Sequence, residues 1–147
     1  MLKKGYILRS GGADGADTAF ELGCNKANGL KEIYLPWPGF NNNLSVLYLT
    51  DNCKGSQEEQ IARKYHPKWP YLSPTIKRIM IRNVYQVLGV TLNHPSKFIL
   101  CYTKDGKVIG GTGFALRLAK ENNIPILNFG SMSKENIEIK IKELVNI

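Results

Sequence analysis

Two glycine-rich stretches carry the residues whose types and spacing could bind a ligand. They are Ser10-Gly11-Gly12-Ala13-Asp14-Gly15, followed by Asp17, and Gly110-Gly111-Thr112-Gly113. Each follows a short apolar run, Gly5–Arg9 or Phe98–Tyr102, and precedes an amphipathic stretch, so each is predicted to join a strand to a helix. Backbone N–H groups at a helix N-terminus bind phosphate, and glycine lets the phosphate oxygens come close. The two turns together predict a phosphate-binding site.

Other side chains near these turns have two interpretations each. Of Asp14 and Asp17, we expect one to cap the following helix and the other to contact the ligand, without assigning which. Thr112 offers a hydroxyl to phosphate and is also a suitable helix N-cap. Trp37, in Leu-Pro-Trp-Pro-Gly, either stacks on a ring of the ligand or anchors a lid between two prolines.

Several common kinds of site are not predicted. Neither glycine turn is a GxGxxG fingerprint, and no GK[ST] Walker sequence occurs, which disfavours ATP hydrolysis of the P-loop type. Cys24, Cys53 and Cys101 lack CxxC spacing and are predicted to be free thiols. His66 and His94 have no partner at a recognisable spacing. We therefore expect no metal and no cofactor.

The elements that must position these residues alternate between strands and helices. Further strands are predicted at Glu32–Leu35 and Pro125–Phe129, and a long loop at Phe40–Ser56. Helices are predicted at about Asp14–Asn25, Gln57–Tyr65, Pro74–Leu88 after Ser73 as N-cap, from Gly113 to about Asn122, and Ser133–Val145. Four apolar strands separated by helices predict an α/β fold. We expect a Rossmann-like three-layer sandwich with a mainly parallel sheet of four or five strands, formed by one domain over residues 1–147.

The charge of the chain predicts an anionic partner. Twenty Lys and Arg against twelve Asp and Glu give a net charge of +8, although a generically basic surface explains the same number. Basic residues concentrate between Lys54 and Arg82, where Tyr65–Tyr71 also mixes aromatic and basic residues. This composition is typical of single-stranded nucleic-acid binding, or of a loop held to the core by aromatics. No apolar run approaches a membrane span, and we expect a cytoplasmic protein with no membrane partner.

Ser10–Asp17 resembles the Ser-Gly-x-Ala-x-Gly-x-Asp turn of DNA-processing protein A and its small relatives. Arg82-Asn83 and Gly110–Gly113 resemble the other two signatures of the superfamily that joins these proteins to the lonely-guy phosphoribohydrolases. The whole chain also looks like small phage-encoded proteins related to DNA recombination mediators, which would place it in the host cytoplasm. The resemblance spans about Tyr6 to Phe129. It implies a nucleotide-derived ligand across the two turns, with Arg82 directed at its phosphate; the alternative is a surface arginine. We expect Asn83 to bond the backbone of a glycine turn rather than the ligand.

The sequence departs from the resemblance where the phosphoribohydrolases carry out catalysis. Their motif Pro-Gly-Gly-x-Gly-Thr-x-x-Glu ends in a carboxylate that participates in cleaving the N-glycosidic bond, and Arg117 stands at that position here. A cation cannot take this role. We therefore expect a binding protein with no catalytic residue. The resemblance alone implies that such a protein would sequester a defence signal of the ADP-ribose type.

Two alternative functions and one assembly state complete the expectations. The alternatives are hydrolysis of a nucleoside phosphate at its N-glycosidic bond, in which Asp14 or Asp17 would act, and single-stranded DNA binding in recombination. The wide apolar stripe of Pro74–Leu88 predicts a homo-oligomer packed in part through this helix, unless the Ser133–Val145 helix covers the stripe within one chain.

Overall fold

The computed structural model describes residues 5–48 and 55–145. This part of the chain forms four strands, five α-helices and three short 3₁₀ turns. In chain order they are β1 (Ile7–Ser10), α1 (Ala16–Lys26), β2 (Leu30–Ile33), η2 (Phe40–Asn42), α2 (Gln57–Tyr65), η3 (Trp69–Tyr71), α3 (Pro74–Leu88), β3 (Ile99–Cys101), η4 (Lys104–Gly106), α4 (Gly110–Glu121), β4 (Ile126–Asn128) and α5 (Lys134–Val145). The chain is therefore a mixed α/β protein, as the pattern of apolar runs predicts.

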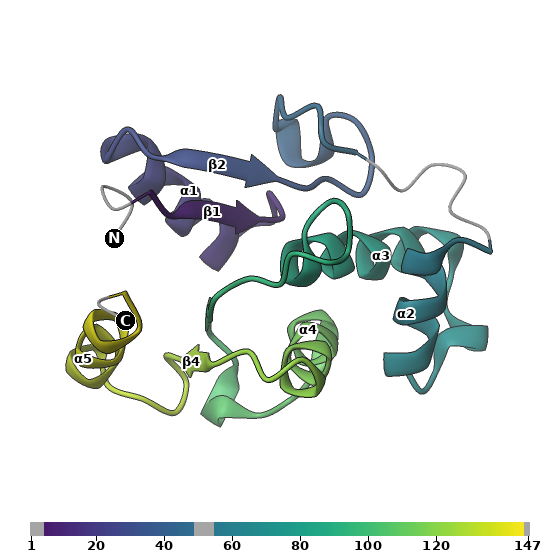
Figure 1. Ribbon diagram of the computed structural model, residues 1–147. Helices are drawn as coiled ribbons and strands as arrows, with labels where there is room; N and C mark the ends of the chain where they lie inside the picture. The colour runs from purple at the N-terminus through teal and green to yellow at the C-terminus, as the bar shows by residue number, and fades with distance from the viewer. Residues whose placement is uncertain (1–4, 49–54, 146–147) are drawn as a thin grey trace.

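Across residues 5–48 and 55–145 the strands pair in parallel and form two separate sheets. β1 pairs with β2, with Ile7 opposite Leu30, and β3 pairs with β4, with Ile99 opposite Ile126. Each pair is connected through one helix, α1 or α4, which gives two strand–helix–strand units (Figure 1). The expected single sheet of four or five strands is not what the structure describes. Apolar runs predict where strands lie but do not specify which edges pair across a long stretch of chain.

Helix α3 lies at the centre of the core. Ser73 caps it, because its Oγ accepts a hydrogen bond from Ile76 N at 3.2 Å, and Gly89 follows its last residue. Its apolar side chains are buried with those of α2 and α4, in a cluster that includes Met80, Ile81, Val84, Tyr85, Val87, Leu88, Ala62, Phe114 and Leu118. α5 packs against β4 instead (Figure 1).

The burial of α3 removes the stated reason for a homo-oligomer. Val84 is fully buried and Met80 only 6% exposed within one chain, since α2 and α4 cover the stripe that was expected to face a second subunit. The Ser133–Val145 helix was the alternative cover for this stripe, but it packs against β4 instead. The homo-oligomer itself stays a prediction.

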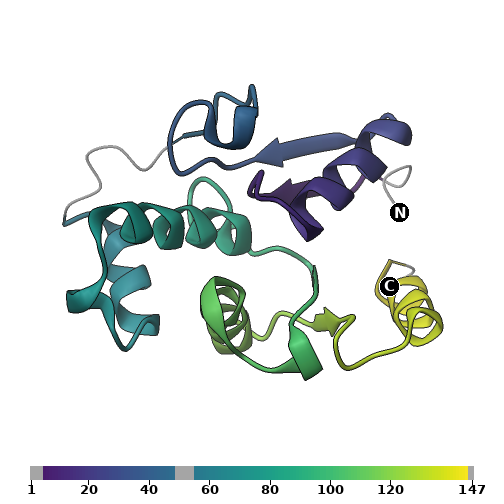
Figure 2. The same cartoon turned by 180° about the vertical axis from the view of Figure 1, so that it is seen from behind.

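The segment after β2 is tied to the first sheet rather than forming an open loop. Leu35 N donates to Leu47 O at 2.8 Å, and Ser45 Oγ donates to Ile33 O at 2.6 Å, so residues 45–47 run beside the outer edge of β2. This region lies above α3 in Figure 1 and is seen from behind in Figure 2. The remainder of the expected loop, with Cys53 and Lys54, lies largely outside the described residues.

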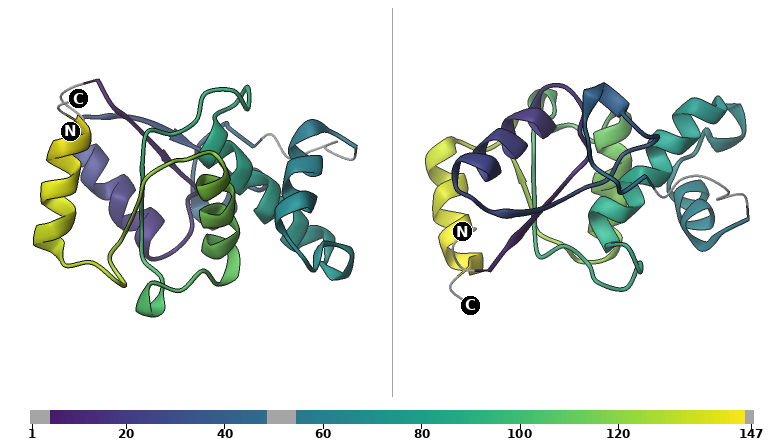
Figure 3. Two further views of the ribbon diagram at one scale, coloured as in Figure 1. Left: turned by 60° about the horizontal axis from the view of Figure 1, so that its bottom comes forward. Right: turned by 90° about the horizontal axis from the view of Figure 1, so that it is seen from above.

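The outer helices lie at opposite ends of the molecule. In every view α2 lies at the end away from α5, with α3 and α4 between them (Figure 3). Within residues 5–48 and 55–145, no helix has the length and apolar character needed to cross a membrane.

Candidate functional site

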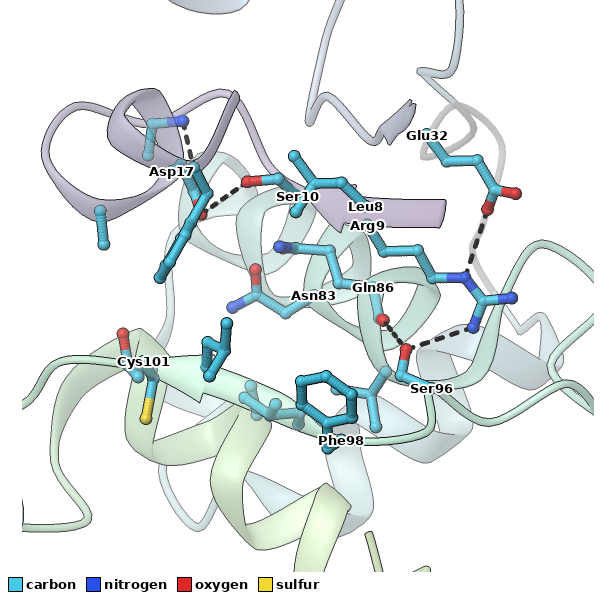
Figure 4. A pocket seen from close by; sticks show the side chains of 18 of the residues that line it. Leu8, Arg9, Ser10, Asp17, Glu32, Asn83, Gln86, Ser96, Phe98 and Cys101 are labelled. Atoms are coloured by element: carbon cyan, nitrogen blue, oxygen red, sulfur yellow. Dashed lines mark hydrogen bonds and ion pairs between the residues drawn. The ribbon is translucent and has the colours of Figure 1, made fainter. Parts of the chain in front are cut away.

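A cavity of about 850 Å³ lies between β1 and β3 and is bounded by α1, α3 and the start of α4. Its body is apolar, with Leu8, Phe20 and Leu100 among the lining residues. Residues from both glycine turns line it where β1 ends, which is called the polar end below, whereas Arg9, Glu32 and Ser96 line its other side (Figure 4). The predicted site residues that line it are Ser10, Asp17, Arg82, Asn83, Gly111 and Thr112. Figure 4 shows Asn83 between the end of β1 above and β3 below.

Asp17 holds the first glycine turn in shape. Its Oδ1 accepts a hydrogen bond from Ser10 Oγ at 3.0 Å (Figure 4), and its Oδ2 accepts one from Ala13 N at 3.2 Å. Both carboxylate oxygens are therefore engaged with the turn itself, at the edge of the cavity.

Neither aspartate caps α1, so the expectation that one of them caps the helix is wrong, and the ligand contact expected of the other stays a prediction. The N-cap of α1 is Gly15, which has φ 86° and no side-chain capping bond. Asp14 lies outside the cavity lining and accepts from Asn41 Nδ2 at 2.9 Å through Oδ1. The start of the helix falls two residues later than expected because Gly15 adopts a left-handed conformation that breaks the helix there.

Arg82 is a buried cation beneath the first turn. Only 5% exposed, it donates through Nη1 to Gly11 O and to Tyr34 O, the latter at 3.5 Å, and through Nε to Asn83 Oδ1 at 2.8 Å. Burial lowers the pKa of its guanidinium, and the charge of Asp17 partly opposes this. Among the described residues no carboxylate forms an ion pair with it. Its positive charge is therefore not neutralised by direct contact.

Asn83 reaches the second turn, as predicted. Its Nδ2 donates to Gly111 O at 3.3 Å, and its Oδ1 accepts the bond from Arg82. Neighbouring residues of α3 therefore bind the backbone of both glycine turns. This pairing fixes the distance between the turns through one rigid helix.

The second turn belongs to helix α4 itself. Gly110 is its first residue, with φ 64°, and the N-cap is Ile109, which makes no side-chain capping bond. Thr112 is therefore not the N-cap, and the expectation that it caps the helix is wrong. It lies inside the first turn of the helix, two residues after Gly110. Thr112 lines the cavity from there.

Several predicted residues support the site without lining it. Gly11 makes room for Arg82, because a Cβ at this position would lie 2.6 Å from Nη1. Gly12 has φ 70°, and a Cβ on Gly113 would lie 2.8 Å from the backbone carbon of Val108. These three glycines serve the folding of the turns.

Trp37 lies in a segment that covers Arg82 from outside the cavity. Its ring meets that of Phe40 edge to face at 5.1 Å, and the guanidinium of Arg78 lies 5.9 Å from its centroid. Phe40 in turn lies 5.7 Å from the guanidinium of Arg82. This arrangement agrees with the lid interpretation of Trp37.

Arg117 does not face the cavity. Its Nε donates to Tyr65 O at 3.0 Å, at the end of α2. The nearby His66 ring is half-buried, and its pKa is lowered by burial first and then by the charge of Arg117. Within the described residues, no group of three or more His, Cys, Asp or Glu side chains could hold a metal ion.

The aromatic and basic segment from Tyr65 to Tyr71 is largely structural. Trp69 is only 2% exposed and packs in the core, with Lys77 Nζ 5.4 Å from its ring centroid. Tyr71 is 88% exposed. The structure therefore favours a loop held to the core over a row of stacking platforms.

Three residues of the site region were missed by the sequence analysis. Asn41 donates to Gly12 O at 3.0 Å as well as to Asp14. These bonds tie the segment that contains Trp37 and Phe40 to the first turn. Gln86 lines the cavity four residues after Arg82, a helical spacing that could have identified it. Tyr102, at the end of the predicted strand, lines the mouth and is 61% exposed.

Comparison with known proteins gives no relative for this chain. No family model matches it, and neither the curated proteins nor the solved structures contain a match.

Proposed function

We propose that the protein binds a phosphorylated nucleotide-derived ligand, such as an ADP-ribose or a cyclic nucleotide derivative, at the polar end of the cavity and does not turn it over. One observation carries the proposal: the buried cation Arg82 and its neighbour Asn83 on α3 bind the backbones of the two glycine turns, and in the part of the chain that the structure describes no carboxylate forms an ion pair with Arg82. A buried positive charge is costly unless an anion compensates it. A phosphate at this end would supply the missing charge.

The N-termini of the helices that follow the two glycine turns are suited to bind a phosphate. α1 and α4 begin without a side-chain cap, whereas Ser56 and Ser73 cap α2 and α3 through their hydroxyls. The first N–H groups of an uncapped helix need an acceptor, and the helix dipole favours a negative one. The hydroxyl of Thr112, in the first turn of α4, is placed to add a donor.

The carboxylates around the cavity support binding over hydrolysis. Asp17 uses both oxygens to hold the first turn, and Glu32 accepts from Tyr34 Oη at 2.6 Å and from Arg9 Nε at 3.3 Å. Asp14 is engaged by Asn41 outside the cavity. A carboxylate that activates water or stabilises an oxocarbenium-like centre must reach the reacting atoms.

Isothermal titration calorimetry tests the proposal. ADP-ribose, its cyclic forms, AMP and cyclic dinucleotides are titrated into the folded protein, and one of them is expected to bind at a single site. Gly111→Glu, which places a carboxylate beside the phosphate, and Thr112→Val are expected to weaken binding at least tenfold, equivalent to about 1.4 kcal/mol. Arg63→Ala, with a side chain 66% exposed and far from the cavity, is the matched control. Absence of heat with every ligand would overturn the proposal.

The same samples separate the other functions. Release of free base from nucleoside monophosphates or NAD-type dinucleotides, detected by chromatography and abolished by Asp17→Asn, would make the protein a hydrolase. Submicromolar, salt-sensitive binding of a labelled oligonucleotide, lost in Lys68→Glu/Arg78→Glu, would instead favour single-stranded DNA as the ligand. Sequestration of a defence signal is the biological use that the resemblance implies for the proposed binding.

The continuous, mainly parallel sheet of a Rossmann-like sandwich is part of the same proposal. Ligands of open parallel sheets bind at the carboxyl ends of the strands, where adjacent strand ends place their turns next to one another. β1 leads directly into the first glycine turn, whereas the second turn follows β3 after the η4 segment; residues from both turns line the cavity. A ligand that bridges the two turns would lie at this edge of the proposed sheet.

A further inference from the structure

One face of helix α3 brings three polar side chains to the cavity. Arg82, Asn83 and Gln86 all line it, because residues three and four positions apart lie on the same side of a helix. The body of the cavity beside them is apolar, with Leu8 and Leu100 in its lining. A polar side chain that faces such a space is costly unless it has a hydrogen-bond partner.

Two of the three side chains have partners in the protein, and the third does not. Arg82 binds Gly11 O, and Asn83 Nδ2 donates to Gly111 O. Gln86 uses its backbone C=O, which accepts from Ser96 Oγ at 2.7 Å. Its side-chain amide makes no hydrogen bond to any residue that the structure describes. The two N–H donors and the carbonyl oxygen of this amide are therefore open to a molecule in the cavity.

The free amide lies against the first glycine turn. A Cβ on Gly11 would lie 2.8 Å from Gln86 Oε1 and 2.6 Å from Arg82 Nη1, so both side chains approach the same residue of the turn. In Figure 4 the Gln86 side chain lies between Ser10 above and Asn83 below and points away from Ser96. The amide therefore lies at the polar end, next to the place proposed for the phosphate.

The chemistry of the amide indicates which part of a nucleotide it contacts. An ionised phosphate offers acceptors only, and the guanidinium of Arg82 is the stronger partner for it. A hydroxyl group both donates and accepts, so it matches the C=O and the N–H of one amide. Gln86 follows Arg82 by four residues, about 6 Å along the helix axis. A ribose carries its hydroxyls at a comparable distance from its 5′-phosphate, whereas the flat faces of a base suit the apolar body.

We propose that Gln86 binds a ribose hydroxyl of the ligand and makes the site selective for ribonucleotides over deoxyribonucleotides. The inference rests on the proposed function, because it places the phosphate of the same ligand beside Arg82. A site that hydrogen-bonds a hydroxyl rejects the analogue that lacks it, since the amide is then left in the cavity without a partner. Gln86 is thus a specificity-determining residue, separate from the side chains that hold the two turns.

Calorimetric titration of AMP, 2′-deoxy-AMP and 3′-deoxy-AMP tests the proposal. AMP is the probe because its adenylate unit also occurs in ADP-ribose and in adenine cyclic dinucleotides. The parent protein is expected to bind AMP at least tenfold more tightly than one of the two deoxy analogues. Gln86→Met removes the amide but keeps the length of the side chain and the helix propensity. This variant is expected to bind AMP and that analogue within twofold of each other.

The ratio of the two affinities separates a direct contact from a structural role. A change in the packing of α3 would weaken AMP and its deoxy analogue alike and leave the ratio unchanged. Gln57→Met is the matched control, because Gln57 is exposed on α2 and does not line the cavity. This control is expected to keep the preference of the parent protein.

Three results would overturn the role of Gln86. They are equal affinity of the parent for AMP and both deoxy analogues, a preference that Gln86→Met retains in full, and absence of AMP binding while a cyclic dinucleotide binds. Each of them leaves the proposed phosphate site in place. Absence of heat with every compound, AMP included, would refute the proposed function and the role of Gln86 with it.

Discussion

Substitution of Gly11 by alanine probes the contact between the first glycine turn and Arg82. A Cβ at this position would lie 2.6 Å from Arg82 Nη1, 2.8 Å from its Cζ and 2.8 Å from Gln86 Oε1. Real Cβ atoms do not approach so closely, so either the guanidinium or the turn must move. Arg82 is only 5% exposed and is held by its bonds to Gly11 O, Tyr34 O and Asn83 Oδ1, so its displacement into the neighbouring cavity would break these bonds.

The expected cost follows from overpacking and lost hydrogen bonds. Forcing an extra methyl group into a well-packed region costs about 1 to 3 kcal/mol. Displacement of Arg82 also weakens its bonds to Gly11 O and Tyr34 O. For a chain of this size we expect Gly11→Ala to lower the melting temperature by about 2 to 12 °C, at about 2 to 4 °C per kcal/mol. Thermal unfolding followed by circular dichroism measures this change.

Gly23→Ala is the matched control, because it adds the same methyl group in the interior of helix α1. A Cβ there meets no atom within 4 Å. Alanine is the better helix former by about 0.5 to 1 kcal/mol, so this variant is expected to be more stable than the parent chain. Equal stability of Gly11→Ala and the parent, with Gly23→Ala behaving as expected, would refute the placement of Arg82 beneath the turn.

Three further predictions follow from other contacts. Ser73→Ala removes the N-cap of α3 and is expected to cost about 1 kcal/mol in the free energy of unfolding, measured by urea denaturation. Asn128→Ala leaves Thr103 N and Gly130 N without their acceptor in a buried region and is expected to cost about 2 kcal/mol or more in the same assay. Burial raises the pKa of the Cys101 thiol to about 11, so its alkylation at pH 8, followed by peptide mass spectrometry, is expected to be about 100-fold slower than that of a thiol of pKa 9. Since the unfolded chain loses this proton first, stability is expected to fall as the pH rises from 9 towards 11; the same change of stability with pH in Cys101→Ser and in the parent would contradict the burial effect.

Local signals in the sequence were sufficient to predict where the α-helices and strands lie along the chain. Ser73-Pro74 and the apolar spacing after it predict α3 with its observed bounds, because capping and helical periodicity depend on residues a few positions apart. The role of Asn83 was also predicted. The roles of Asp14 and Asp17 were not, since they depend on Asn41 and Ser10, which reach them through tertiary structure.

The same local signals could not predict which strands pair or which elements cover the apolar face of α3. An apolar run such as Phe98–Tyr102 predicts a strand, but its partner depends on an approach between segments far apart in the chain. The stripe on α3 indicates that the helix is buried and does not say by what. Here α2 and α4 cover it, so surplus apolar surface was a poor guide to a second subunit.

The central claim is that one ligand engages both glycine turns. It is tested most directly by titrating the ligand of highest affinity into ¹⁵N-labelled protein and following the backbone amides by NMR. The amides of Ala13, Asp17, Gly111 and Thr112 are expected to shift together and to fit one dissociation constant, with Lys64 and Tyr71 unchanged. Shifts confined to one turn, or concentrated around Lys64 and Tyr71, would contradict the claim.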